Sequence, residues 1–158
     1  VPIIHEHGGT VNCFMGDGIM ASFGVPQALP DPCAAAFDAG RAMLDYLRNL
    51  NIELAQKGEP PLEIGVGLHV GEGVAGHIGA ATRHDYSVIG DVVNVASRLE
   101  GVTKEVGYHL VCSRAVVDRL TDRAELVALG ARPIKGHSAV EIFGYDRIEP
   151  PAGTPKTL

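Results

Sequence analysis

The 158-residue chain has no tryptophan, three cysteines and no long apolar run. Cys13, Cys33 and Cys112 are odd in number and lack zinc-ligand spacing, which argues against a disulfide framework or zinc knuckle and favours a reducing, cytoplasmic location. The apolar runs are far shorter than the ~20 residues that span a bilayer, and no signal-like leader opens the chain. We therefore expect no membrane contact by this segment, and a place on the cytoplasmic side if the parent protein is membrane-attached.

Basic residues are also scarce. The formal net charge is −6 and no basic stripe is visible, so we expect no nucleic-acid partner. A nucleotide held locally through one or two cations is compatible with that charge. Apolar residues make up 46% of the chain and aromatic residues 5%, which indicates one domain with an aliphatic core.

Two short apolar runs, residues 11–15 and 19–23, flank Gly16-Asp17-Gly18 and predict a β-hairpin with Asp17 at its tip. Asp-Gly is a favoured two-residue turn because both positions tolerate positive φ, so this motif alone favours a plain turn over a ligand site. An exposed carboxylate is also what a hard cation such as Mg²⁺ binds. Both interpretations stay open for Asp17 on this evidence.

Helical periodicity indicates a helix over residues 32–56, with Asp31 as N-cap and Pro32 at its first position. Strict alternation of apolar with small or polar residues predicts a strand over residues 62–70, whose nearly bare second face would let a helix or ligand come close. The glycine-rich residues 71–79 lack the Gly-Lys-Ser/Thr of a phosphate loop, and we expect a flexible hairpin arm there.

A strand at residues 86–90 should lead to a second long helix with Asp91 as its N-cap. Asn94 and Arg98 are four residues apart and therefore project from one side of this helix. On spacing alone, a solvated polar face explains them as well as a site does. The opposite, buried stripe comprises Val92, Val95 or Ala96, Leu99 and Val102.

The remaining elements are a strand at 108–112, a short helix at 113–120 and a closing hairpin from 125–129 to 140–145. Antiparallel hairpins dominate, which indicates an α+β fold with helices over one face of a mixed sheet. Residues 1–148 form one domain on this interpretation, and residues 149–158, with their prolines, form a flexible tail. Residues 1–9 look like a helix end closing on a glycine pair, so we expect the chain to begin inside a larger domain.

Three ordered segments, Phe14–Gly24, Ile64–Glu72 and Asp85–Glu100, closely resemble the catalytic domain of class III adenylyl and guanylyl cyclases, with the bacterial members nearest. The resemblance extends from about His7 to Tyr145. It implies a ferredoxin-like core, here lacking its first strand, and a head-to-tail homodimer with two shared active sites. It also implies conversion of ATP to 3′,5′-cyclic AMP and pyrophosphate in signal transduction, with an upstream or attached regulatory domain.

The resemblance further implies roles for single residues. In the family, two aspartates of one protomer hold two Mg²⁺ or Mn²⁺ ions around the nucleoside triphosphate; Asp17 matches the second, and the first lies upstream of this chain. Asn94 and Arg98 match the partner protomer's asparagine, which orients the ribose, and its arginine, which stabilises phosphate charge. Lys135 looks like the lysine that reaches the terminal phosphates. Without the first strand and one metal ligand, we expect this segment alone to be poorly active.

The chain departs from the family at two positions that read the base. Adenylyl cyclases typically carry lysine and aspartate or threonine there, whereas this chain has Cys13 and Ser87. A hydroxyl can replace that of threonine, but a thiol cannot replace an ammonium group at the purine N1. Cys13, Phe14, Ser87 and Lys135 are the candidate nucleotide-binding residues, and we expect ATP to be weakly favoured over GTP. The alternatives are a guanylate or dual-specificity cyclase, or a degenerate cyclase-fold module for nucleotide sensing or dimerisation.

Overall fold

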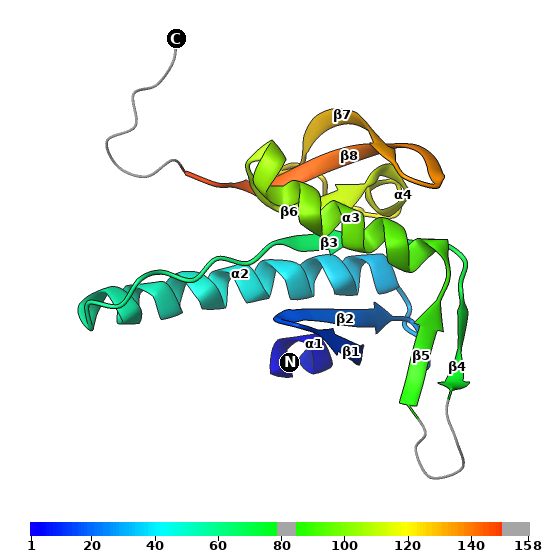
Figure 1. Ribbon diagram of the computed structural model, residues 1–158, viewed down its shortest axis with the longest axis horizontal. Coiled ribbons are helices and arrows are strands. Elements are labelled where there is room, and N and C mark those ends of the chain that lie inside the picture. The colour runs from blue at the N-terminus through cyan, green and yellow to red at the C-terminus, as the bar shows by residue number, and fades with distance from the viewer. Residues whose placement is uncertain (79–84, 150–158) are drawn as a thin grey trace.

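A computed structural model of the chain describes residues 1–78 and 85–149 (Figure 1). The elements in chain order are α1 (Pro2–Glu6), β1 (Gly9–Met15), β2 (Gly18–Phe23), α2 (Pro32–Gln56), β3 (Val66–Leu68), β4 (Val74–Ile78), β5 (Asp85–Ile89), α3 (Asp91–Val106), β6 (Tyr108–Ser113), α4 (Arg114–Val117), β7 (Val127–Ile134) and β8 (His137–Arg147). The helix end expected at residues 1–9 is α1. The expected tail lies outside the described residues, apart from Glu149.

Backbone hydrogen bonds join the strands of the described ranges into three sheets. Four strands follow the order β3-β6-β8-β7, in which β3 is parallel to β6 and the other neighbours are antiparallel. The other two sheets are the antiparallel hairpins β1–β2 and β4–β5. In Figure 1 the β4–β5 hairpin projects from the body beside the start of α3, so the hairpin arm expected at residues 71–79 is confirmed up to Ile78.

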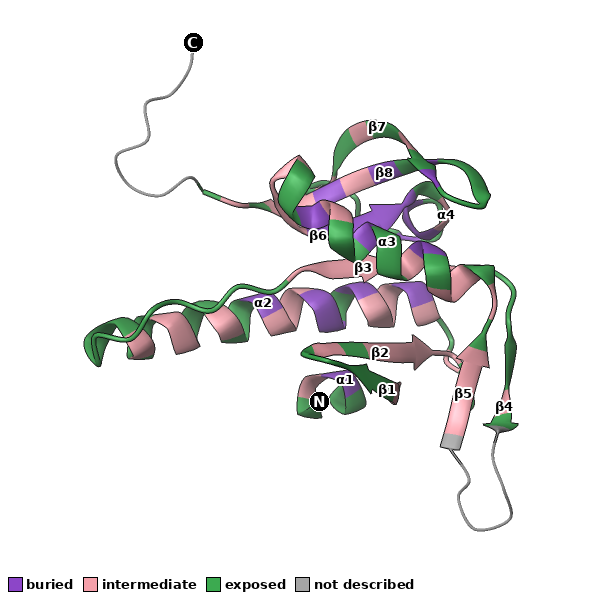
Figure 2. Cartoon of the chain, in the orientation of Figure 1, coloured by how far each residue is buried: buried purple, intermediate pink, exposed green. Residues whose placement is uncertain are grey.

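The two long helices pack on opposite faces of the four-stranded sheet. Phe37 of α2 and Leu110 of β6 belong to one buried cluster, whereas Leu99 of α3 and Val111 of β6 belong to another. Adjacent residues of a strand point to opposite faces, so the two clusters lie on two sides of the sheet. Figure 2 shows the buried residues gathered on β6, β8 and the helices. The mixed α+β class is confirmed, with helices on both faces of this sheet instead of one.

Helix α2 has the expected bounds, residues 32–56. Its N-cap is Asp31, whose Oδ1 accepts a hydrogen bond of 3.0 Å from the backbone N–H of Ala34. The buried positions Cys33, Phe37 and Leu44 fall in the first half of the helix. No helix within residues 1–78 or 85–149 is long and apolar enough to cross a membrane.

The strand expected over residues 62–70 is shorter in the structure, where β3 covers Val66–Leu68. At Leu62 the backbone N–H and C=O bond to the side chain of Asn51, at 2.8 Å each, and so take a helix side chain as partner instead of a strand. The bare face is confirmed. A Cβ on Gly67 would lie 2.4 Å from the carbonyl oxygen of Ala96, so α3 packs directly on this glycine.

Two glycines test this close approach. Gly67→Ala is expected to lower the free energy of unfolding by about 1–3 kcal/mol, because the added methyl group meets the fixed backbone of α3. Gly101→Ala is the matched control: it lies within α3, a Cβ there has open space, and alanine favours a helix by about 0.5–1 kcal/mol over glycine. Urea unfolding of both variants measures the difference, and a Gly67→Ala protein as stable as the wild type contradicts the packing.

Two predicted helix boundaries were wrong. Gly90, with φ +145°, is the N-cap of α3, and Asp91 is the first residue of the helix; its carboxylate pairs with His137 instead of capping. The short helix expected at residues 113–120 has only the four residues of α4. The chain after it tightens into three-residue turns, in which the N–H of Leu120 bonds to the C=O of Val117.

The closing hairpin is longer than expected. β7 and β8 pair from Val127 to Ile134 and from His137 onward, which leaves Lys135 and Gly136 as the turn. Two register shifts in β7 leave Leu129 and the proline at position 133 without ladder partners, and the strand continues past them to Ile134. Lys135 therefore lies on a tight turn between two paired strands.

Candidate active site

Asp17 lies at the tip of the β1–β2 hairpin. Met15 pairs with Gly18, so the two turn residues are Gly16 and Asp17, and Gly16 supplies the positive φ of +62°. The hairpin is confirmed, with a Gly-Asp turn in place of the expected Asp-Gly turn. The Asp17 side chain is exposed and makes no hydrogen bond or ion pair with another described residue. Its carboxylate oxygens are free to bind a cation.

The candidate base-reading residues lie on two neighbouring strands. Cys13 and Phe14 belong to β1 just before the turn and are both exposed, with Phe14 at 67%. The register shifts at Asn12, which forms a bulge and moves the strand relative to its partner. β1 contacts β5, which carries the half-buried Ser87. The two positions thus come from strands that lie against each other.

Asn94 and Arg98 project from the exposed face of α3. The buried residues of this helix, Val95, Leu99 and Thr103, point the other way, so the helix orientation expected from the periodicity is confirmed. The side chains of Asn94 and Arg98 have no hydrogen-bond or ion-pair partner in the part of the chain that the structure describes. An amide and a planar guanidinium are therefore available to a ligand on one helix face.

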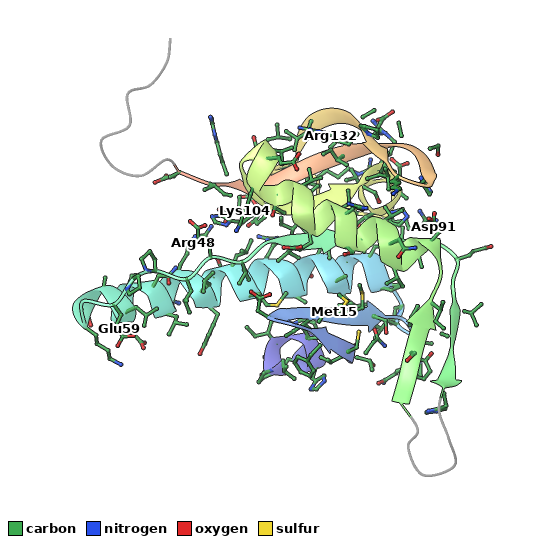
Figure 3. The ribbon with its side chains drawn as sticks, in the orientation of Figure 1. Met15, Arg48, Glu59, Asp91, Lys104 and Arg132 are labelled. Atoms are coloured by element: carbon green, nitrogen blue, oxygen red, sulfur yellow. The ribbon has the colours of Figure 1, made fainter. Side chains whose placement is uncertain are left out.

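Lys135 is exposed on the β7–β8 turn, and this turn is tied to α3. The neighbouring His137 places its Nε2 3.0 Å from Oδ2 of Asp91, the first residue of α3. Figure 3 labels Asp91 at the end of α3 that follows β5. The structure thus brings the Lys135 turn to the helix of Asn94 and Arg98. The sequence interpretation missed this contact. The signal that was available is the spacing, because Asp91 is three residues before Asn94 and therefore lies on the same helix face.

His69 lies directly after β3 and is half-buried beside this contact. Its Nδ1 is 2.8 Å from Oγ of Ser113, and its ring meets that of His137 edge-on with 6.5 Å between centroids. Burial lowers the pKa of His69 below its ordinary value of 6.5; His137 lowers it further and Asp91 opposes both. We infer that His69 is neutral at neutral pH.

The depressed pKa of His69 predicts a pH dependence of stability. As the pH decreases below 6.5, His69 of the unfolded chain binds a proton while His69 of the folded chain does not, so the free energy of unfolding decreases until the pH passes the folded pKa. The His69→Asn variant should lack this decrease in the free energy of unfolding. Urea unfolding between about pH 5 and pH 8 measures it as the difference between wild type and variant. Identical pH profiles for the two proteins contradict the assignment.

The three cysteines are free thiols. Burial raises the pKa of Cys112 to about 12 and also raises the pKa of Cys33. Both buried thiols are therefore protonated, and so poorly nucleophilic, at neutral pH. Within the described ranges no three His, Cys, Asp or Glu side chains gather to hold an ion.

A divalent metal nonetheless fits the Asp17 turn. Mg²⁺ commonly uses one or two carboxylates and completes its shell with water and substrate phosphates, so a full protein cage is not required. Asp17 offers unpaired hard oxygen ligands at an exposed turn, and Gly16 beside it leaves open space. The donor chemistry fits Mg²⁺ or Mn²⁺ shared with a triphosphate.

The candidate residues do not line either of the two main cavities of the described structure. One groove, of about 500 Å³, lies between β2, the segment after β3 and the start of α3; Asn12 lines it, and both amide atoms of Asn12 are buried without a hydrogen-bond partner. The other, of about 610 Å³, lies between α2, β6 and the end of β8. Asp17, Asn94, Arg98 and Lys135 lie on the exposed surface instead.

Comparison with known proteins matches this geometry to one family. The family model for the adenylate and guanylate cyclase catalytic domain matches residues 5–145. Adenylate cyclase 1 of Rhizobium meliloti (strain 1021) is 34% identical over 142 residues, which cover 89% of this chain and 21% of that protein. The chain therefore spans about a fifth of the length of this curated relative.

Solved structures give the same result. The adenylyl cyclase CyaB from P. aeruginosa has a TM-score of 0.80 and 29% identity, with 98% of this chain and 79% of that chain covered. The guanylyl cyclase Cya2 has a TM-score of 0.77 and 32% identity, with 96% and 77% covered. Both base specificities thus occur among the neighbours. The resemblance seen in the sequence is confirmed, and the chain belongs to the family of adenylate and guanylate cyclase catalytic domains.

Proposed function

We propose that this domain is an adenylate cyclase, which converts ATP to 3′,5′-cyclic AMP and pyrophosphate in a homodimer with shared active sites. One observation carries the proposal: a chain of the cyclase family leaves Asp17, Asn94 and Arg98 exposed, and unpaired among the described residues, at the positions that match the family's metal, ribose and phosphate residues. Mass-spectrometric identification of the product from ATP and from GTP, with Mn²⁺ and the full-length protein, tests it. Absence of any cyclic nucleotide contradicts it.

The reaction is an in-line attack of the ribose 3′-oxygen on the α-phosphorus, so the protein mainly positions the substrate and neutralises charge. Asn94 would hold the ribose through its amide. Arg98 would donate planar N–H groups to the oxygens on which negative charge develops, a task for which a fixed guanidinium suits better than a mobile ammonium. Lys135, on its turn beside α3, would hold the terminal phosphates that leave as pyrophosphate.

Asp17 would bind Mg²⁺ or Mn²⁺ together with the triphosphate. Each active site would hold two such ions, and a second aspartate would share in binding them. Bound metal supplies a lower pKa for the attacking hydroxyl and charge neutralisation for the leaving group. The unpaired carboxylate of Asp17 and its exposed position support this role. The matched residues of the nucleotide site remain Cys13, Phe14, Ser87 and Lys135 in this proposal.

The homodimer is supported by exposed apolar side chains around the candidate residues. Phe14 and Ile19 beside the Asp17 turn are 67% and 42% exposed, and Val74 and Ile89 on the β4–β5 arm are 73% and 54% exposed. Apolar groups gathered around a polar site are typical of an interface. A second protomer covering them would bring the Asp17 of one chain to the α3 face of the other.

Base selection gives a sharp prediction. We expect the wild type to favour ATP over GTP by less than about tenfold, because an exposed thiol at Cys13 is a poor hydrogen-bond partner. Cys13→Lys should raise that ratio by about tenfold or more, since a hydrogen bond from a charged donor contributes 1.5–3 kcal/mol. The ratio of kcat/KM for the two nucleotides measures it, with Cys33→Ala as the control thiol. A clear wild-type preference for GTP favours the guanylate or dual-specificity alternative.

A degenerate cyclase-fold module for nucleotide sensing or dimerisation is the second candidate, and Cys13 at the lysine position is the observation that favours it.

We also propose that residues 1–148 are only part of the catalytic domain. β2 and β3 share no ladder, and the groove between β2 and the segment after β3 holds the Asn12 amide, which has no hydrogen-bond partner among the described residues, as a sheet without its first strand would. This segment alone should therefore be poorly active. A regulatory domain elsewhere in the protein and a cytoplasmic location complete the proposal.

A further inference from the structure

Four polar side chains outside the matched residues meet at the start of α3. His137, the first residue of β8, has its Nε2 3.0 Å from Oδ2 of Asp91 and its Nδ1 2.8 Å from the carbonyl oxygen of Ser138. His69 packs its ring edge-on against the His137 ring and bonds to Ser113 on β6 at 2.8 Å. The cluster of Asp91, His137, His69 and Ser113 thus joins α3, β8, β6 and the end of β3.

Both partners of the His137 ring accept hydrogen bonds and neither donates. A carbonyl oxygen faces one ring nitrogen and a carboxylate oxygen faces the other, so both bonds form only when both nitrogens carry a hydrogen. The contact with Asp91 is a hydrogen bond when Nε2 carries the hydrogen, and it is a charge-assisted bond when the ring is protonated. Asp91 is also the first residue of α3, where the helix dipole favours a negative charge.

This bond holds one side of the turn that carries Lys135. Ile134 and His137 are paired across the hairpin, and Lys135 and Gly136 form the turn between them. Ile134 is buried in the same cluster as Leu99 of α3, which anchors the other side of the turn to the same helix. The backbone beneath Lys135 is thus attached to α3 at both ends.

The anchor point is on the helix face of the candidate residues. Asp91 precedes Asn94 by three residues and Arg98 by seven, a spacing that places all three on one side of α3. Figure 3 locates Asp91 at the N-terminal end of the helix. The turn of Lys135 is therefore fixed at the end of the face from which Asn94 and Arg98 project.

Such a contact contributes little to folding. The side chains of His137 and Asp91 are 29% and 54% exposed, and ion pairs at this exposure are weak in solution. The contact between Asp91 and His137 acts instead on the position of Lys135, because a displaced ammonium group loses contact with a bound phosphate.

We propose that Asp91 and His137 are positioning residues, whose ion pair holds the β7–β8 turn so that Lys135 reaches the terminal phosphates of a nucleoside triphosphate bound over Asn94 and Arg98. This rests on the role of Lys135 in the proposed function. His69 supports the pair by packing against the His137 ring, and Ser113 supports it by bonding to His69. None of the four touches substrate in this assignment.

The test compares variants of the full-length protein. His137→Ala and Asp91→Asn break the pair, whereas His137→Lys keeps a cation beside Asp91. Arg132→Ala is the matched control, because Nη1 of Arg132 lies 3.8 Å from Oε2 of Glu105 and so also joins β7 to α3, in the last turn of the helix. The measurements are KM and kcat with Mn²⁺, the Kd of a 3′-deoxynucleoside triphosphate, which cannot cyclise, and the thermal unfolding midpoint.

We expect His137→Ala and Asp91→Asn to raise KM and Kd by about threefold to fivefold, the most that the loss of an exposed ion pair of up to about 1 kcal/mol can produce, with kcat and the unfolding midpoint little changed. His137→Lys and Arg132→Ala should stay close to wild type. In a Lys135→Ala background, His137→Ala should have no additional effect, because both act through one lysine.

Two results overturn the proposal. One is a His137→Ala protein with wild-type KM and Kd; the other is an effect of His137→Ala that persists in full without Lys135. Failure of the proposed function is a separate result. A wild type that forms no cyclic nucleotide contradicts the cyclase assignment, while the Kd series with the 3′-deoxynucleotide still decides whether the ion pair positions Lys135.

Discussion

Arg98→Ala and Asn94→Ala are each expected to lower kcat/KM by an amount equivalent to about 2–4 kcal/mol of transition-state stabilisation. Both side chains project from the exposed face of α3 with no partner in the described chain, so their loss leaves the fold intact. Arg98 should act mainly on kcat, because charge on the phosphate oxygens grows as the reaction proceeds. Asn94 should act through the orientation of the ribose.

Lys104→Ala is the control for this pair. It removes an exposed cation from the last turn of the same helix, where the family has no matched role. Its kcat/KM should equal that of the wild type. Near-normal activity of both Asn94→Ala and Arg98→Ala, at unchanged stability, refutes the roles assigned to the α3 face.

Asp17→Asn is expected to reduce kcat/KM by more than about 100-fold. Removal of a group that only hydrogen-bonds to a metal ligand costs up to about 100-fold, and loss of a ligand itself should cost more. Asparagine keeps the size of the side chain and fits the same turn, but its amide lacks the negative charge that binds a hard cation. The variant should need a higher Mn²⁺ concentration for half-maximal activity. Its unfolding midpoint should be unchanged, because none of residues 1–78 and 85–149 pairs with the carboxylate.

Asp38→Asn provides the matched change of charge at an exposed position of α2. It should leave both activity and the Mn²⁺ requirement as in the wild type. If Asp17→Asn behaves in the same way as Asp38→Asn, the hairpin tip is a plain turn, and the interpretation that Gly16-Asp17-Gly18 favoured on its own is the correct one.

The elements that the sequence predicted well are those whose pattern is local. The bounds of α2 follow from a capping aspartate, a proline at the first position and a regular apolar stripe. The buried side of α3 follows from its periodicity, which is why Asn94 and Arg98 were correctly placed on the exposed face. The β1–β2 hairpin was predicted from two apolar runs around a turn motif.

The parts that were not predicted depend on distant residues. β3 is short because its ladder partner, β6, begins some forty residues later and because Asn51 takes the backbone groups of Leu62. The Lys135 turn was not predicted, because the paired strands continue past Leu129 and Pro133 only through shifts in register. The contact between His137 and Asp91 joins residues 46 positions apart, and no local pattern indicates it.

The central claim is a composite site with Asp17 from one protomer and Arg98 from its partner, and mixing two variants tests it most directly. Asp17→Asn and Arg98→Ala are each expected to be almost inactive alone. In an equal mixture that exchanges subunits at random, half of the dimers are mixed and one of their two sites is intact, so about a quarter of the wild-type activity should return. Activity that stays at the level of the separate variants, although mixed dimers form, contradicts the shared site.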